Sequence, residues 1–137
     1  MSSNSEVAPT STPSSTGMVW TGRVLSTLPV LMLLMSATMK FVKPPGFAEG
    51  LAKLGLPENQ ANGLGVIELV CTALYVIPQT SVLGAILLTG YLGGATATHV
   101  RVGDPWFAPV LIGVVLWLGL FLRGKRLRAL IPFRSAA

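Results

Sequence analysis

The residue best suited to chemistry in this sequence is Glu68, because it lies well inside a long apolar segment. A charged side chain in such a segment is costly to bury and is a functional candidate by default. Residues three or four positions apart share one face of a helix, so Gly65, Thr72 and Tyr75 lie on the same face as Glu68. We expect this polar face to point into the protein rather than at lipid.

A buried carboxylate needs a cation or a hydrogen-bond donor, and the sequence offers three cationic partners. Lys40 ends the first apolar segment, whereas His99 and Arg101 end the third. Consecutive membrane helices alternate in direction, which places all three in the same membrane half as Glu68. The spacing does not say which of them pairs with it. The predicted polar pocket comprises Lys40, Glu68, Thr72, Tyr91, Thr96, His99 and Arg101.

Three interpretations of this pocket stay open. The charges could form an ion pair that fixes the helix register, a site for a small ligand such as a quinone head group, or a proton or ion path. We assign no catalytic residue. One cysteine, one histidine and five carboxylates spread along the chain predict no metal site and no internal disulfide.

The composition indicates which kind of protein must position these residues. Of 137 residues, 51% are apolar and 11% are charged, against about 25% charged in an ordinary soluble domain. This is too little charge to cover a small soluble protein with a polar surface. The composition therefore excludes a soluble enzyme, a disordered regulator and a nucleic-acid-binding module, and it leaves an integral membrane protein.

Four apolar segments predict the architecture, and each is close to the roughly 20 residues that cross a ~30 Å hydrocarbon core. Their continuous apolar character favours helices, because a membrane strand would alternate polar and apolar residues. We therefore predict an all-α, antiparallel four-helix bundle in the membrane, with residues 20–124 as its domain. The predicted spans are residues 21–41, 61–77, 82–100 and 106–122.

The two ends of the chain differ from this domain. Residues 1–19 form a Ser/Thr/Pro-rich tract, which predicts a disordered tail. This tract has no basic region typical of a signal peptide, so we expect the first span to be retained. Residues 125–137 form a basic tail, and five of the ten basic residues lie at or near it: Arg123, Lys125, Arg126, Arg128 and Arg134.

The basic residues also predict an orientation. A basic cluster beside a span acts as an orientation signal and contacts anionic lipid heads. Six Lys or Arg residues belong to the side that holds the termini and four to the opposite side. This difference favours both termini in the cytoplasm.

Two further patterns concern packing. In the long connection over residues 42–60, four apolar residues are spaced nearly as on a short amphipathic helix in the membrane interface: Phe47, Leu51, Leu54 and Leu56. In the third span, Gly90, Gly94 and Ala97 form a small-residue stripe that lets another helix pack closely, either within the chain or between chains.

Several segments resemble the DoxX-like family of small four-helix bacterial membrane proteins. The most specific is LTGYLGGATATHVR at 88–101, and SATMKF at 36–41 and GVIEL at 65–69 are weaker. The resemblance covers roughly residues 20–124. It implies a link to quinone-coupled sulfur oxidation, in which related membrane subunits take part. It supplies no agreed set of catalytic residues.

These observations lead to one expected function and one alternative. We expect an accessory or anchor subunit of a quinone-linked redox complex, multi-pass in the bacterial inner (plasma) membrane. The alternative is a small transporter or proton-conducting protein that uses the Glu68 cluster. The sequence has no cofactor motif of its own, so a self-contained enzyme is not expected, and quinone is the one cofactor considered. The expected partners are the lipid bilayer and either a membrane oxidoreductase or a second copy of the chain, with no nucleic acid.

Overall fold

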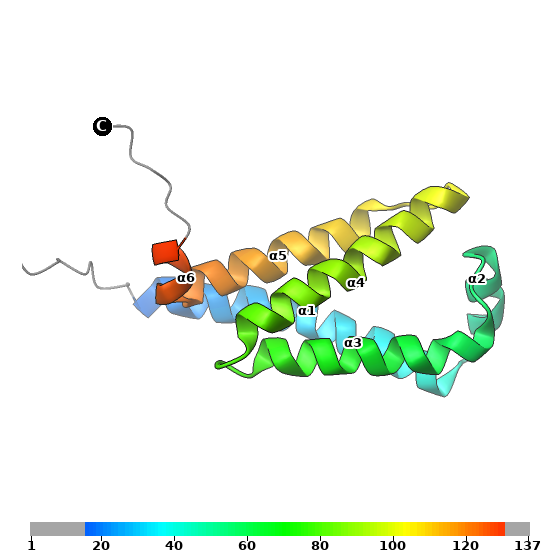
Figure 1. Ribbon diagram of the computed structural model, residues 1–137, viewed down its shortest axis with the longest axis horizontal. Coiled ribbons are helices and arrows are strands. Elements are labelled where there is room, and N and C mark those ends of the chain that lie inside the picture. Colours follow the sequence, from blue (N-terminus) through cyan, green and yellow to red (C-terminus); the bar gives the residue numbers. More distant parts are fainter. Residues whose placement is uncertain (1–15, 131–137) are drawn as a thin grey trace, which may run out of the picture.

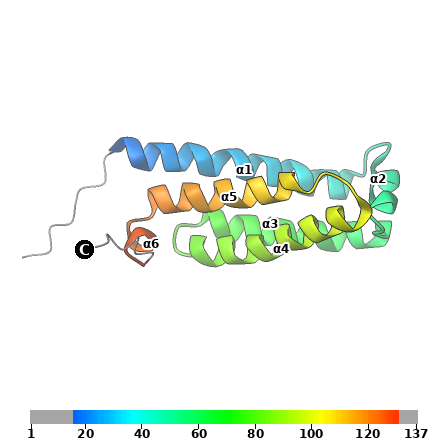
Figure 2. The ribbon, with the colours of Figure 1, turned by 90° about the horizontal axis from the view of Figure 1, so that it is seen from above.

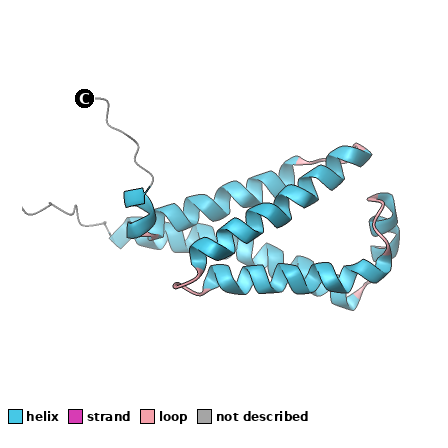
Figure 3. Cartoon of the chain, in the orientation of Figure 1, coloured by secondary structure: helices cyan, strands magenta, loops and turns pink. Residues whose placement is uncertain are grey.

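The computed structural model describes residues 16–130, and every regular element in this range is a helix (Figures 1 and 3). No strand occurs in residues 16–130, so the prediction of an all-helical chain is confirmed. The elements are α1 (Thr16–Val42), α2 (Phe47–Lys53), the 3-10 helix η1 (Glu58–Gln60), α3 (Ala61–Val76), α4 (Ser81–Val102), α5 (Phe107–Arg123) and α6 (Lys125–Leu130).

The four longest helices, α1, α3, α4 and α5, lie alongside one another and give the molecule an elongated shape (Figure 2). Helix α1 packs against α3 and α5, and α4 packs against the same two helices. The start of α1, the α3–α4 turn and α6 lie together at what we call the terminal end. Helix α2, η1 and the α4–α5 connection lie at the opposite end, the loop end (Figure 1).

The interior is formed by a narrow strip from each long helix. Leu33, Tyr75, Leu88 and Leu116 come from four different helices, and each is at most 3% exposed. The outward faces are also apolar, and large side chains such as Leu31, Met35, Val70, Ile86 and Leu118 are exposed. An apolar surface of this extent is typical of contact with a membrane or another protein rather than with water.

The lengths of the helices bear on the predicted spans. Within the described residues, α1 with 27 residues and α4 with 22 are long and apolar enough to cross a membrane. Helix α5 is a shorter apolar helix of 17 residues, and α3 has 16 residues, or about 24 Å at 1.5 Å per residue. A crossing by all four helices stays a prediction.

Two pairs of helices approach so closely that glycine is required. A Cβ atom added to Gly84 of α4 would lie 2.2 Å from the backbone nitrogen of Tyr75 in α3. A Cβ added to Gly119 of α5 would lie 2.5 Å from the Ser26 hydroxyl of α1. By contrast, a Cβ on Gly90 or Gly94 would meet no atom within 4 Å, so the predicted stripe does not pack within the described chain.

The boundary of the predicted N-terminal tail needs correction. Helix α1 begins at Thr16, so residues 16–19 are helical and not part of a disordered tail. Met18 to Trp20 are apolar, and no proline follows Pro13 until Pro29, so nothing in this stretch stops the helix. The basic tail likewise begins with a helix, α6. The remaining tail residues, 1–15 and 131–137 with Arg134, lie outside the described residues.

The short helix expected in the long connection is present as α2. It ends at Lys53, and the chain then turns through Gly55, whose φ of +71° is in the left-handed region that favours glycine. Leu54 and Leu56 therefore follow the helix rather than extend it. The location of α2 in a membrane interface stays a prediction.

Candidate functional site

An ion pair between α1 and α3 forms the centre of the candidate site. Lys40 Nζ lies 2.8 Å from Glu68 Oε2. Glu68 is only 1% exposed, and the Lys40 side chain is 14% exposed. Of the three cations predicted as partners for Glu68, Lys40 is therefore the one that pairs with it. The pairing joins the last turns of α1 to the middle of α3.

Ser36 completes this contact from one helical turn before Lys40. Lys40 Nζ donates to the Ser36 hydroxyl at 2.7 Å, and that hydroxyl donates to Glu68 Oε2 at 3.4 Å. The ammonium group also lies 3.4 Å from the Ser36 carbonyl oxygen. The buried charges are thus paired and hydrogen-bonded, which is the arrangement that makes their burial tolerable.

Tyr91 brings α4 to the same cluster. Its ring centroid lies 6.0 Å from Lys40 Nζ, within the range of a cation–π contact. The surroundings of its hydroxyl include the Glu68 carboxylate. Three helices therefore contribute a cation, an anion and two hydroxyl groups. We call Ser36, Lys40, Glu68 and Tyr91 the Lys40–Glu68 cluster.

The other predicted pocket residues bond elsewhere. The Thr72 hydroxyl donates to the Glu68 backbone carbonyl at 2.7 Å, and Thr96 donates to Leu92 at 2.8 Å. His99 Nδ1 lies 2.8 Å from the Ala95 carbonyl oxygen. Arg101 donates to the Leu54 carbonyl at 2.7 Å, so it ties the end of α4 to the connection after α2.

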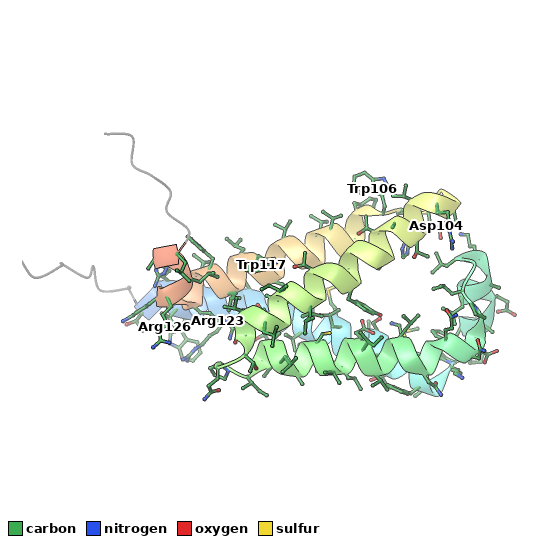
Figure 4. The ribbon with its side chains drawn as sticks, viewed as in Figure 1. Asp104, Trp106, Trp117, Arg123 and Arg126 are labelled. Atoms are coloured by element: carbon green, nitrogen blue, oxygen red, sulfur yellow. The ribbon has the colours of Figure 1, made fainter. Side chains whose placement is uncertain are left out.

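Thr96 lines a groove of about 450 Å³ between α4 and α5. Within this groove, Trp117 Nε1 donates to the Thr89 hydroxyl at 2.8 Å. Figure 4 shows Trp117 between the two ends of the molecule. The groove is otherwise lined by apolar and small side chains, among them Pro109, Val110 and Gly113.

A second polar centre, which the sequence patterns did not single out, joins three helices near the terminal end. The Tyr75 hydroxyl of α3 donates to the Leu116 carbonyl of α5 at 2.7 Å. It also bonds to the Ser26 hydroxyl of α1 at 3.0 Å. Gly22 and Ser26 are four residues apart, a small-residue spacing that predicts close helix packing and could have revealed this contact.

Charge is distributed unevenly between the two ends. All acidic side chains of residues 16–130 lie in the part of the molecule between the middle of α3 and the loop end. Four basic side chains lie in the same part. The terminal end carries basic side chains alone, of which Figure 4 shows Arg123 and Arg126. The first group contains Glu49, Glu58, Glu68 and Asp104 with Lys40, Lys43, Lys53 and Arg101. The terminal end contains Arg23, Arg123, Lys125, Arg126 and Arg128.

The fold and these polar contacts define a class, that of small all-helical proteins with membrane-capable helices and a buried ion pair between them. The sequence profile of the DoxX-like family matches residues 24–122, and the chain belongs to that membrane-associated family. The match includes the whole Lys40–Glu68 cluster. No curated protein and no solved structure matches the chain.

Proposed function

We propose that the chain is an integral protein of the bacterial inner membrane, with α1, α3, α4 and α5 crossing the bilayer as an antiparallel bundle. The exposed apolar faces of these helices support this proposal, because such side chains are stable in lipid. The basic terminal end supports a cytoplasmic location for both termini, since basic residues are retained on that side.

Within this membrane domain, the proposed role is that of an accessory or anchor subunit of a quinone-linked redox complex. The observation that carries it is the buried Lys40–Glu68 ion pair, at 2.8 Å. In the membrane a paired charge of this kind is a functional candidate by default. We propose that a partner protein carries the redox centre itself, since the described residues outside the four long helices form only short helices and turns.

The chemistry of the cluster fits a quinone head group. The Tyr91 hydroxyl is a donor for a carbonyl oxygen. The Lys40 ammonium, which in the structure donates to Ser36 and Glu68, would redirect one of its three N–H groups to a bound head group. Lys40 and Tyr91 would hold the head group, and Glu68 would keep the ammonium oriented. When bound, a quinone supplies reversible two-electron, two-proton chemistry.

Quinone content tests this role. The full chain would be extracted gently from its native membrane, and its quinone would be measured by solvent extraction and chromatography. We expect Glu68→Gln and the double variant Lys40→Gln/Glu68→Gln, neither of which leaves the carboxylate buried without its cation, to lose most of the bound quinone while remaining folded. Lys53→Gln, which removes an exposed lysine at the loop end, is the control and should retain it.

Two results would contradict this proposal. One is a quinone content that does not differ between the wild type and the cluster variants. The other is a loss of thermal stability with no quinone in the wild type, which would assign the cluster to fixing the register of α1 and α3. A co-purifying oxidoreductase would support the anchor role independently of quinone.

A proton path is the second candidate, and a specific observation favours it. Glu68 and Lys40 are two ionisable side chains held in contact between α1 and α3. Reconstituted liposomes with an imposed pH gradient would test this function. Proton flux that depends on Glu68 and not on Lys53 would favour the path over the quinone site.

A further inference from the structure

A groove at the terminal end lies apart from the Lys40–Glu68 cluster. It runs between α1 and the end of α3, and the last residue of α5 closes it. Its volume is about 410 Å³. Ser26 and Tyr75 at its base are buried, whereas Trp20 and Val76 at its rim are exposed. Arg23, Thr27, Val30 and Arg123 complete its lining.

Two arginine side chains of this groove are oriented by aromatic rings rather than by carboxylates. The Arg23 guanidinium carbon lies 5.3 Å from the centroid of the Trp20 ring, and that of Arg123 lies 5.0 Å from the Tyr75 ring. A ring contact restrains a guanidinium group without using its N–H donors. Both groups therefore retain donors for an anion.

The hydrogen bonding of Arg123 points to a missing acceptor. Its Nη2 atom makes one long bond, of 3.4 Å, to the Tyr75 carbonyl oxygen. Its Nε atom is buried and has no hydrogen-bond partner among the described residues. A buried donor without an acceptor is costly. The described part of the chain places no acidic side chain at this end, so the Arg123 guanidinium, which is partly exposed, has no anionic partner from these residues.

The levels of the two arginines match each other. A Cβ added to Gly22 would lie 2.8 Å from the backbone nitrogen of Arg123, so Arg23 and Arg123 stand at nearly the same height. Trp20 lies one turn closer to the terminal end, as expected of a tryptophan at the membrane–water interface. On the side of the two arginines away from Trp20, Val30 and Val76 provide an apolar surface that leads toward the middle of the helices.

We propose that this groove binds one anionic phospholipid, with the phosphate between Arg23 and Arg123 and an acyl chain along Val30 and Val76. Arginine pairs match the geometry and charge of a phosphate group, and the apolar wall favours a lipid over a free anion. The inference rests on the proposed membrane integration. It does not depend on the quinone role.

Native mass spectrometry of the full chain in mild detergent tests the proposal, with phosphatidylglycerol and phosphatidylcholine as probes. We expect one phosphatidylglycerol to bind in preference to phosphatidylcholine. Arg23→Gln and Arg123→Gln should each weaken its binding, and the double variant should weaken it by about tenfold. Arg126→Gln, which removes a charge of α6 outside the groove, is the matched control and should bind as the wild type does.

Three results would overturn the site. Equal binding of the two lipids would remove the role of the anionic head group, and an equal loss in Arg126→Gln would indicate diffuse attraction to basic residues. Displacement of the lipid by inorganic phosphate would indicate a site for free anions. Arg23 is exposed, so Arg23→Gln gives a clear answer even if Arg123→Gln fails to fold. Release of the wild type from membranes by alkaline carbonate would instead reject membrane integration itself.

Discussion

The Tyr75 hydroxyl bonds to the Ser26 hydroxyl at 3.0 Å, although the two residues are 49 positions apart in the sequence. The same oxygen donates to the Leu116 carbonyl at 2.7 Å. One buried phenol of α3 thereby connects α1 and α5, which both lie beside it near the terminal end.

Replacing Tyr75 with phenylalanine should lower the free energy of unfolding by about 1 kcal/mol, the usual net contribution of a buried hydrogen bond. Thermal unfolding in detergent would measure the change. Thr38→Val is the control, because the Thr38 hydroxyl is exposed and bonds only to the backbone of its own helix. An unchanged midpoint for Tyr75→Phe would contradict the three-helix contact.

Removing Lys40 alone should lower the free energy of unfolding much more than removing both members of the Lys40–Glu68 ion pair. Lys40→Met leaves the Glu68 carboxylate buried without a cation, and losses of about 3–5 kcal/mol are typical of such changes. The double variant Lys40→Met/Glu68→Gln should recover most of this loss. Unfolding midpoints of the two single variants and the double variant would show it, and purely additive effects would argue against a direct ion pair.

Gly84 and Gly90 should respond differently to alanine, although both lie in α4. A Cβ at Gly84 would meet the α3 backbone at 2.2 Å, and overpacking of this kind costs about 1–3 kcal/mol. A Cβ at Gly90 would meet nothing within 4 Å, so Gly90→Ala should not destabilise the monomer. A stable monomer but a weakened oligomer for Gly90→Ala would assign the open stripe to contact between copies.

Arg101 should stabilise the ordered conformation of the connection between α1 and α3 at the loop end. Its bond to the Leu54 carbonyl joins the segment after α2 to the end of α4. In Arg101→Gln we expect faster hydrogen exchange over residues 47–60. Lys53→Gln removes an ion pair to Asp104 that is largely exposed and is expected to change the exchange little. Equal effects of both variants would indicate that charge, not this hydrogen bond, orders the segment.

The helices could be predicted well from the sequence because continuous apolar runs report helix length directly. The helix predicted over 82–100 is found at Ser81–Val102, and the helix predicted over 61–77 at Ala61–Val76. The start of the first helix was misplaced, because a tail defined by its Ser/Thr/Pro composition gives no sharp boundary. The structure places that start at Thr16.

The partners of individual side chains were harder to predict. The sequence predicted Lys40, His99 and Arg101 in the same membrane half as Glu68, but the level of each residue along its helix and the rotation of that helix about its axis decide which of them reaches it. Arg101 lies in the last turn of α4 and bonds to Leu54, whereas Glu68 lies in the middle of α3. The same rotation turns Gly84 toward α3 and Gly90 away from it. Spacing along one helix defines a face, and only packing against the neighbouring helices defines where that face points.

The separation of charge between the two ends has an electrical consequence. In the described residues the acidic and basic side chains outside the terminal end balance, four of each, so the whole net charge resides at the terminal end. In the proposed membrane orientation, with both termini in the cytoplasm, turning the molecule over would carry that charge across the bilayer against the membrane voltage. Each elementary charge contributes about 2.3 kcal/mol per 100 mV. An energised membrane, negative on the cytoplasmic side, would therefore oppose any reversal of the orientation set at insertion.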